Sequence, residues 1–347
     1  MPEFRVRRDD LSQCEVAETE PREDLADGEA QLEVERFALT TNNVTYGQVG
    51  DLLGYWDMFP APDGWGRIPA WGYARVDESR SPLLDPGARL YGFVPMASSF
   101  TIRPEPHPAG VLDAAEHRAA FAPVYRQYLP VEGDGDDALL IMRPLFATAV
   151  LLDLDLEERA SDGAGTVVVT SASAKTAYGL AHLLRDRPVR TAGLTSPARR
   201  DWVSALGLYD EVLDYEDLDG LEVSGRAVLV DFAGNAALLR AVHERLGDAL
   251  ARSIRVGFTH RDAEVDGPPP PGPAPEFFFA PQAMAAHGRE LVEHFAAGWA
   301  TLAPVLADHL RIERVRGADE LLRVYRELLD GRADPAAGFI ASLADGR

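Results

Sequence analysis

The sequence predicts an α/β fold with a parallel sheet, preceded by a β-rich domain. Its 347 residues exceed the usual size of one hydrophobic core, and 46% of them are hydrophobic, which is enough for two cores. The first part of the chain alternates apolar and polar residues, whereas strand and helix signals alternate between residues 138 and 259. Strands separated by helices of ordinary length form parallel sheets, so this second region predicts a parallel α/β domain.

In the β-rich region, the segment AQLEVERFALT at 30–40 alternates apolar and polar residues and predicts a half-buried strand. Residues 50–72 are dense in Gly, Pro and aromatic side chains and have no period, which predicts a structured loop. The segment DPGARLYGFV at 85–94 predicts a turn followed by a strand.

In the α/β region, predicted strands and helices alternate. The strands are expected at 166–170, 189–194, 211–214, 226–232 and 252–259, and the helices at 176–186, 198–206 and 235–249. The segment VDGPPPPGPAPE at 265–276 predicts a stiff connector, because consecutive prolines continue neither a helix nor a strand. Two helices near 286–306 and 318–330 and a last strand at 338–343 are expected after it.

The charge of the chain excludes several partners. Asp and Glu number 56 against 34 Lys and Arg, which gives a formal net charge of −22. So acidic a surface repels nucleic acid and anionic membranes unless positive charges are concentrated, and the sequence has no long basic stripe. Neither the opening segment nor the apolar stretch 138–152 resembles a signal peptide or a membrane span. We therefore expect a cytoplasmic protein that acts on a small-molecule substrate.

Metal chemistry is not predicted. A single cysteine, Cys14, excludes an internal disulfide and the multi-cysteine zinc sites. The eight histidines are scattered and form no His-x-x-x-His pattern. The Gly-x-Ser-x-Gly pattern of a serine hydrolase is also missing from the sequence.

The loop after the first strand of the α/β region is a candidate nucleotide-binding turn. A dinucleotide fold places the pyrophosphate at the N-terminus of the helix that follows, here within VVVTSASAKTAYGLAHLL at 167–184. The loop lacks the glycines of a Walker loop, but its small residues have the spacing of a Rossmann loop. The cofactor-binding candidates are Ser171, Ser173, Ala174, Lys175, Thr176 and Ala177. The alternative is a plain strand-to-helix turn capped by serine.

Two arginines after the second strand indicate which nucleotide is bound. Ser196 is a suitable N-cap and Pro197 a suitable first helical residue, which leaves Arg199 and Arg200 in the first turn. Cations there oppose the helix dipole unless an anion is present. Enzymes that use NAD carry an acidic residue at this point, whereas arginine accommodates the 2′-phosphate of NADPH. The alternative is a pair of solvated arginines.

In order and spacing, the motifs of the chain resemble those of the medium-chain dehydrogenase/reductase superfamily, above all its zinc-free quinone-reductase-like members. The resemblance is carried by LTTNNVTYGQVGDLLGYWDMFP, PGARLYGFV, VVVTSASAKTAYGLA, GLTSPARRDWVSALGLYDEVLDY, VLVDFAG, IRVGFTH and LLDGRADPAAGFIASL. It implies a Rossmann dinucleotide-binding domain at 126–285 and a GroES-like substrate domain made of 1–125 and 286–347. The departures from the family motifs indicate a divergent branch.

The resemblance also implies catalytic residues. Zinc-dependent members carry ligands where this chain has Asn43 and Gly72-Tyr73-Ala74, so no catalytic metal is expected. Asn43, Tyr46 and Tyr73 are the catalytic candidates, in a cleft between the domains. A tyrosine hydroxyl can donate a proton or polarise a carbonyl while hydride arrives from the cofactor. The alternative for Tyr46 is an aromatic side chain packed under Trp56 or Trp71, and Tyr73 can equally be structural.

Three further cofactor contacts are implied. Thr148 aligns with a threonine beside the nicotinamide in relatives, and Phe258 and Phe278 lie in and after the fifth strand, where relatives line the nicotinamide site. The alternatives are a helix threonine bonded to its own backbone and phenylalanines of a core strand.

The predicted function is therefore that of a zinc-independent, NADPH-dependent oxidoreductase that transfers hydride to a small conjugated carbonyl, enone or quinone. Relatives commonly form a homodimer through edge strands of the nucleotide domain, and the chain is compatible with one. Two alternatives stay open. The protein can be a lyase, a hydrolase or a ligand-binding protein that uses the same fold without hydride transfer. It can also be a component of a protein assembly that binds its partners through its acidic surface.

Overall fold

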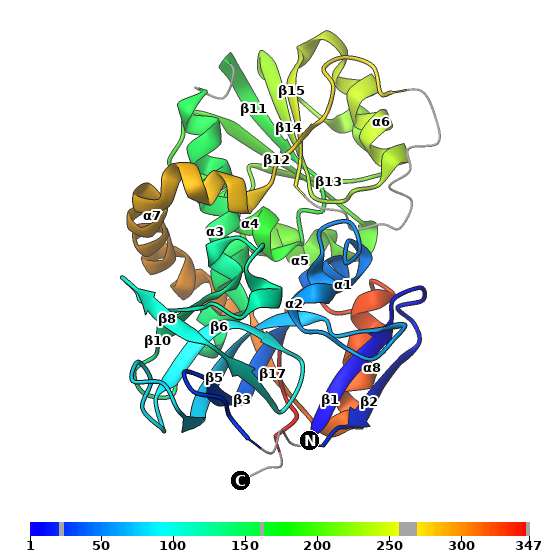
Figure 1. Ribbon diagram of the computed structural model, residues 1–347. Helices are drawn as coiled ribbons and strands as arrows, with labels where there is room; N and C mark the ends of the chain where they lie inside the picture. Colours follow the sequence, from blue (N-terminus) through cyan, green and yellow to red (C-terminus); the bar gives the residue numbers. More distant parts are fainter. Residues whose placement is uncertain (21–23, 160–162, 257–268, 345–347) are drawn as a thin grey trace. The chain divides into compact units, whose positions relative to one another are not determined.

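A computed structural model describes residues 1–20, 24–159, 163–256 and 269–344. The chain divides into two compact units, which are coloured along the sequence in Figure 1. The first unit comprises Met1–Ile141 and the chain from Arg311 onward, and the second comprises Met142–Leu310.

The second unit contains a six-stranded sheet in which all neighbouring strands are parallel. Its strands are β11 (Ala164–Val169), β12 (Arg190–Thr195), β13 (Glu211–Asp214), β14 (Arg226–Asp231), β15 (Leu250–Arg255) and β16 (Glu276–Phe277). Their spatial order, β13-β12-β11-β14-β15-β16, is the 3-2-1-4-5-6 order of a dinucleotide-binding sheet. Such sheets bind ligands outside the carboxyl ends of the strands, where the order reverses, which is here between β11 and β14.

Helices cover both faces of this sheet. Four of the helices in this unit are α3 (Asp137–Glu158), α4 (Lys175–Leu184), α6 (Ala236–Leu246) and α7 (Ala280–His309). Val167 and Val169 of β11 are fully buried against α3, α4 and α7, whereas Val168 is buried with α6. Figure 1 shows α6 on the opposite side of the sheet from these three helices. Because successive side chains of a strand point to opposite faces, a continuous β-branched run indicates a strand that is buried on both faces.

The first unit is β-rich. Its strands are β1 (Pro2–Arg7), β2 (Cys14–Glu18), β3 (Ala30–Leu39), β4 (Trp65–Gly66), β5 (Pro69–Ser79), β6 (Arg89–Pro95), β7 (Ser99–Ile102), β8 (Pro104–His107), β9 (Gly110–Asp113), β10 (Gln127–Pro130), β17 (Arg311–Arg316) and β18 (Ala337–Ser342). The larger sheet has the order β17-β18-β3-β5-β6-β10-β9-β8, with β7 paired to β3. The unit also holds α1 (Thr41–Gln48), α2 (Tyr55–Met58) and α8 (Gly317–Leu329). The late strand β18 pairs antiparallel with β3, so the last part of the chain completes the first unit.

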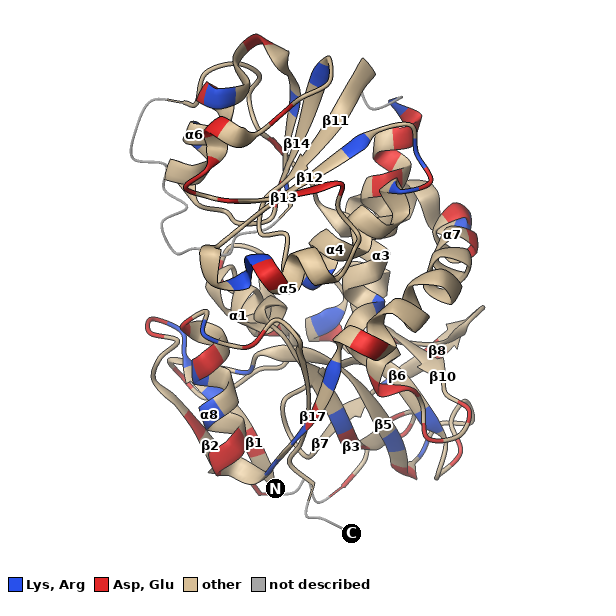
Figure 2. Ribbon diagram, turned by 180° about the vertical axis from the view of Figure 1, so that it is seen from behind, with Lys and Arg blue, Asp and Glu red and all other residues tan. Residues whose placement is uncertain are grey.

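Charged side chains on this sheet occur largely as pairs. Arg75 of β5 contacts Glu33, and Nε of Arg89 lies 2.9 Å from Glu35 Oε1. Figure 2 shows basic and acidic segments next to each other on β3 and β5. Arginines thus balance part of the acidic charge locally, although such partly exposed pairs stabilise the fold by only about 0–1 kcal/mol each. No helix in the described part of the chain combines the length and apolar character that crossing a membrane requires.

Two parts of the chain differ from the sequence prediction. The segment 41–48, for which no helix was predicted, is helix α1, and the expected loop at 50–72 contains α2, β4 and the start of β5. The compact units also have other bounds than the predicted domains. Strand β10 still belongs to the sheet of the first unit, and α7 is held in the second unit by the buried Leu302 and Leu306.

Candidate functional site

The carboxyl ends of β11 and β14 are joined by a hydrogen-bond network. Thr170, which follows β11, donates from Oγ1 to Asp231 Oδ1 over 2.6 Å. The same Oγ1 accepts the backbone N–H groups of Phe232 and Ala233 at 3.0 and 3.1 Å. The network therefore fixes the start of the candidate loop at the point where the strand order reverses.

The next residue, Ser171, has a φ of +50° and is the one non-glycine residue of the described ranges with a positive φ. A glycine usually takes such a left-handed position, because a Cβ there costs about 1–2 kcal/mol. Ala172 follows and is fully buried, with its carbonyl accepting the hydroxyl of Tyr209 at 3.0 Å. The sharp turn of a nucleotide-binding loop is thus made without glycine, at the cost of local strain.

Helix α4 begins without a side-chain cap. Its N-cap residue is Ala174, so the alternative interpretation, a turn capped by serine, is wrong. Lys175 and Thr176 form the start of the helix, while Ala177 is fully buried behind them. The first N–H groups of an uncapped helix, together with its dipole, attract an anion. Lys175 is the only lysine in the whole sequence.

The two arginines after β12 have different surroundings. A 3₁₀ turn, Pro197–Arg199, follows the N-cap residue Ser196. Helix α5 (Arg200–Ala205) begins directly after this turn. Ser196 makes no capping bond with its side chain, so the expected α-helical turn that holds both arginines is wrong. Arg199 donates from a terminal nitrogen to Ser173 Oγ over 3.4 Å, whereas Arg200 forms an ion pair of 3.2 Å with Asp214.

Two polar residues beside this loop, Tyr215 and Asp231, were not predicted from the sequence. Burial raises the pKa of Tyr215, and its hydrogen bonds to Ser171 and the nearby Arg199 guanidinium oppose that rise. Burial likewise raises the pKa of Asp231, against the hydrogen bonds from Thr170 and Ala233. The only signal for either residue was its place at the end of a strand.

In the first unit, both the oxygen and the nitrogen of the Asn43 side-chain amide form hydrogen bonds within the protein. Its Oδ1 accepts the backbone N–H of Thr40 at 2.8 Å, which completes a capping box at the start of α1. Its Nδ2 donates to the carbonyl of Pro69 over 3.0 Å, where β5 begins. Asn43 thus attaches α1 to β5.

Tyr46 is buried in a group of rings that we call the aromatic cluster, defined as Tyr46, Tyr55, Trp71, Phe93 and Tyr125. Its hydroxyl accepts hydrogen bonds from Asn42 Nδ2 at 2.6 Å and from Trp71 Nε1 at 3.3 Å. Burial, followed by the neighbouring Tyr55, raises the pKa of Tyr46 well above its usual range. The alternative interpretation, a contact with Trp71, describes its packing correctly.

Tyr73 lies elsewhere on β5 and is bonded to the start of α3. Its hydroxyl donates to the carbonyl of Asp136 over 3.0 Å and accepts the N–H of the same residue at 3.3 Å. The guanidinium of Arg36 lies 4.7 Å from the centre of its ring. The structure therefore brings Asn43 and Tyr46 together on α1 and gives Tyr73 different partners.

The remaining candidates have mixed positions. Thr148 donates to the carbonyl of Pro144 over 3.0 Å, as the backbone-bonded alternative expected. Phe278 is partly buried against the core under α3, α4 and α7, and Phe258 lies outside the described residues. Within the described ranges, no group of three or more His, Cys, Asp or Glu side chains is placed to hold a metal ion, and zinc independence stays a prediction.

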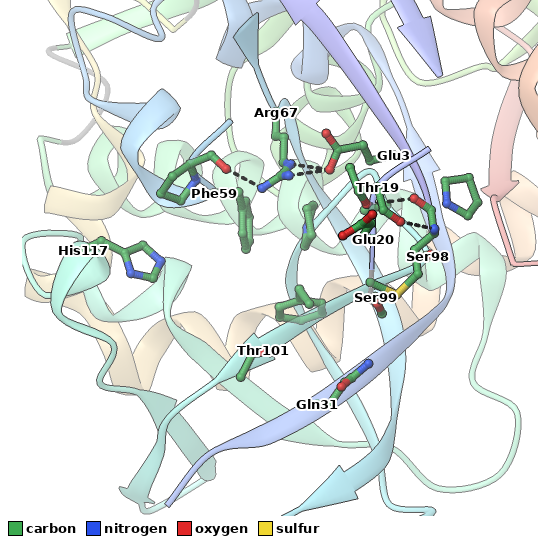
Figure 3. A pocket seen from close by; sticks show the side chains of 16 residues that line it. Glu3, Thr19, Glu20, Gln31, Phe59, Arg67, Ser98, Ser99, Thr101 and His117 are labelled. Atoms are coloured by element: carbon green, nitrogen blue, oxygen red, sulfur yellow. Dashed lines mark hydrogen bonds and ion pairs between the residues drawn. The ribbon is translucent and has the colours of Figure 1, made fainter. Parts of the chain in front are cut away.

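The first unit also has a pocket of about 260 Å³. Figure 3 shows Arg67 at its wall, and this side chain donates from Nε to Glu3 Oε2 over 2.8 Å. Phe59 and Phe100 supply apolar surface, and burial lowers the pKa of His117 at the edge. None of the predicted site residues is among the described residues that line this pocket.

A protein family described as "Protein of unknown function (DUF2855)" matches residues 37–334 of the chain. The chain belongs to the DUF2855 family. The search of curated proteins found no match to this DUF2855 sequence.

Solved structures resemble the DUF2855 chain over its full length. CurA from Vibrio vulnificus in complex with NADPH has 14% sequence identity, covers 100% of both chains and gives a TM-score of 0.67. Mycobacterial Rv1454c complexed with NADPH has 16% identity, with 98% of this chain and 99% of that chain covered and a TM-score of 0.56. The quinone oxidoreductase from Coxiella burnetii has 12% identity, 99% coverage of both chains and a TM-score of 0.56. These similarities confirm the predicted fold, a Rossmann-type domain with a β-rich GroES-like domain.

Proposed function

We propose that the protein is an NADPH-dependent oxidoreductase that acts without zinc on a small conjugated carbonyl, enone or quinone. The observation that carries this proposal is the loop after β11. A left-handed Ser171 turns the chain at the reversal of a 3-2-1-4-5-6 sheet and leads directly into the uncapped helix α4. NADPH is present in the similar structures of CurA and Rv1454c, which supports the choice of cofactor.

The residues present fit a dinucleotide. The N–H groups at the start of α4 and the side chain of Lys175 would hold the pyrophosphate. Small side chains at Ser173, Ala174 and Ala177 leave room for its close approach. When bound, the cofactor supplies a hydride to the substrate. In the same proposal Thr148 and Phe278 lie near the nicotinamide.

We assign the 2′-phosphate mainly to Arg199. Arg200 already pairs with the carboxylate of Asp214, which reduces the positive charge that it presents. Arg199 lies beside the candidate loop, where it contacts Ser173 and its charge acts on Tyr215, and this position carries the assignment. Charge-assisted hydrogen bonds to a phosphate contribute about 1.5–3 kcal/mol, so we expect at least a tenfold preference for NADPH over NADH.

Among the catalytic candidates, Tyr46 fits the chemistry best. Its raised pKa keeps the phenol protonated at neutral pH, so it can polarise a carbonyl by donating a hydrogen bond. The indole of Trp71 can only donate, and it therefore orients the hydroxyl by filling one acceptor position. Asn43 and Tyr73 have structural roles in this proposal, because the fold already binds their polar groups.

The test combines cofactor titration with labelling of Lys175. NADPH and NADH fluorescence titrations give both affinities for the wild type, Arg199→Ala and the matched control Arg200→Ala. We expect the preference for NADPH to fall about tenfold in Arg199→Ala and to change less in Arg200→Ala. Because the chain has one lysine, acetylation of Lys175 followed by mass spectrometry reports directly on the loop, and NADPH should protect it. Equal affinities for both nucleotides together with unprotected Lys175 would exclude the proposal.

The proposal extends to location and assembly. We place the enzyme in the cytoplasm and expect a homodimer through the edge strand β16, whose Phe277 is 49% exposed. Sedimentation of the wild type and of Phe277→Asp tests the assembly, since a charge on this strand should leave only monomer.

A further inference from the structure

Two tyrosines of the aromatic cluster form a hydroxyl pair that the proposed reaction does not yet use. Tyr55 belongs to α2, and Tyr125 ends the short 3₁₀ turn Pro123–Tyr125. Their hydroxyl oxygens lie 2.9 Å apart, and their rings meet nearly at right angles with centres 5.6 Å apart. The ring of Tyr46 lies 4.9 Å from that of Tyr55.

The pair carries one proton more than its own hydrogen bond uses. Two hydroxyl groups have two protons, and the bond between them occupies one. The hydroxyl that accepts this bond keeps its own proton, for which no acceptor exists among the described residues. Burial raises the pKa of both tyrosines, so both remain protonated at neutral pH.

The surroundings of the pair are aromatic. The ring of Phe93 lies 5.0 Å from that of Tyr125 and 6.5 Å from that of Tyr55. Trp71 lies 6.4 Å from Tyr125, and Tyr125 itself is only partly buried. Ring-lined surroundings favour a flat apolar body, and burying an anion there without a counter-charge costs more free energy than burying a neutral acceptor.

We infer that the Tyr55–Tyr125 pair binds the carbonyl oxygen of a neutral aromatic substrate by donating its second proton in a hydrogen bond. This inference rests on the proposed function, because it names the substrate class of that oxidoreductase. The hydroxyl that accepts a bond from its neighbour donates a stronger one, since hydrogen bonds in a chain polarise each other. The proton stays on the tyrosine, and the bond polarises the carbonyl group.

The test compares acetophenone with ethylbenzene, which has a similar shape but no acceptor oxygen. Both are titrated by ligand-observed NMR, with and without NADP⁺, which holds no hydride and therefore allows no turnover. The decisive variant is Tyr55→Phe combined with Tyr125→Phe, because it removes the donating hydroxyl whichever of the two tyrosines carries it. The control is Tyr325→Phe, which removes a buried hydroxyl of the same unit that donates to the carbonyl of Leu11.

We expect the double variant to bind acetophenone about three- to tenfold more weakly and ethylbenzene within about twofold of the wild type, as for the loss of one hydrogen bond. Tyr325→Phe should change neither affinity. Thermal unfolding checks that each variant folds. If the double variant does not fold, each single variant is measured, and the one that lacks the donating hydroxyl should show the selective loss.

Three results would overturn the inference. Acetophenone that does not bind the wild type excludes the site, and equal losses for both ligands mean that the hydroxyls only support packing. Unchanged acetophenone binding means that the second proton meets only water. The proposed function has a separate test, because it fails if NADPH does not bind. Selective binding of acetophenone in that case would show that the protein binds carbonyl compounds but is not a reductase.

Discussion

The helices α1 and α4 begin in opposite ways. At α1, Thr40 and Asn43 form a complete capping box, so the first N–H groups already have partners inside the fold. At α4, the N-cap residue Ala174 offers no side chain, and the preceding Ser171 is in a left-handed conformation. The N–H groups at a capped helix end already have acceptors, whereas those at an uncapped end after a strained turn can bind an anionic ligand. The comparison separates the structural role of Asn43 from the proposed binding role of the α4 loop.

Adding a cap to α4 should have the largest effect. Ala174→Asp would accept the N–H groups of Thr176 and Ala177 and stabilise the free protein by about 1 kcal/mol. Its carboxylate would also occupy the proposed pyrophosphate position, and repulsion should lower NADPH affinity about 100-fold. The control Ala174→Ser caps without charge and should lower the affinity less. Unfolding midpoints and NADPH titrations measure both effects, and an unchanged affinity in Ala174→Asp would place the pyrophosphate elsewhere.

Removing the cap of α1 should lower stability without altering the nucleotide site. Asn43→Ala loses its bonds to Thr40 and Pro69, and the unpaired buried groups should cost about 1–3 kcal/mol of unfolding free energy. Urea unfolding measures this loss, while NADPH affinity should stay within about twofold. Asn43→Asp keeps the acceptor for Thr40 and should lose less. A selective loss of NADPH affinity at full stability would assign Asn43 to the site instead.

The network behind the α4 loop should show a dependence on pH. Asp231 has a folded-state pKa above its ordinary value of 3.8, so the stability that its protonated form contributes is lost as the pH rises from about 4 through the raised pKa. Asp231→Asn can keep the bond from Thr170 and does not titrate, so its stability relative to the wild type should increase across this window by about 1.4 kcal/mol per unit of pKa elevation. Urea unfolding at several pH values measures the difference. A difference that does not change with pH would mean that Asp231 is ionised throughout.

The smallest effect concerns the strained turn. Ser171→Gly should relieve the left-handed strain and raise the unfolding free energy by about 0.5–1 kcal/mol, part of which the greater freedom of the unfolded chain offsets. NADPH affinity should change by less than about threefold, since the backbone path is kept. Thermal unfolding and NADPH titration measure the two quantities. A loss of stability would show that the Ser171 side chain, through Tyr215, contributes more than the strain costs.

The sequence predicted the second unit well because its signals are local. The β-branched run around Val168 and the spacing of the following helix identify a buried parallel strand and its crossover without knowledge of distant contacts. The order of the strands was not predicted, and only the structure gives it. The backbone of Ser171 could not be predicted, since serine has no preference for a positive φ, and the conformation is imposed by the network from Thr170 to Asp231.

The candidate site in the first unit was less predictable, since it depends on contacts distant in sequence. The alignment indicated Asn43, Tyr46 and Tyr73, but partners such as Pro69, Trp71 and Asp136 decide what each can do. Tyr125 carried no motif, and only the fold brings its hydroxyl to Tyr55. The arginines were found in the sequence, but the carboxylate that pairs with Arg200 is that of Asp214, the last residue of β13, farther along the chain.

The pairing of β18 with β3 determines when the first unit can be finished during synthesis. Phe339 of β18 pairs with Leu39 of β3. All residues between these two must therefore be synthesised before β18 leaves the ribosome and can pair with β3. Until then, the end of β3 at Phe37–Leu39 lacks this partner and exposes backbone groups, which other nascent chains can bind. The second unit has its whole sequence available earlier. We therefore expect cotranslational folding to begin in the middle of the chain. The N-terminal strands then stay incompletely paired until a chaperone or their own C-terminal partner strand binds them.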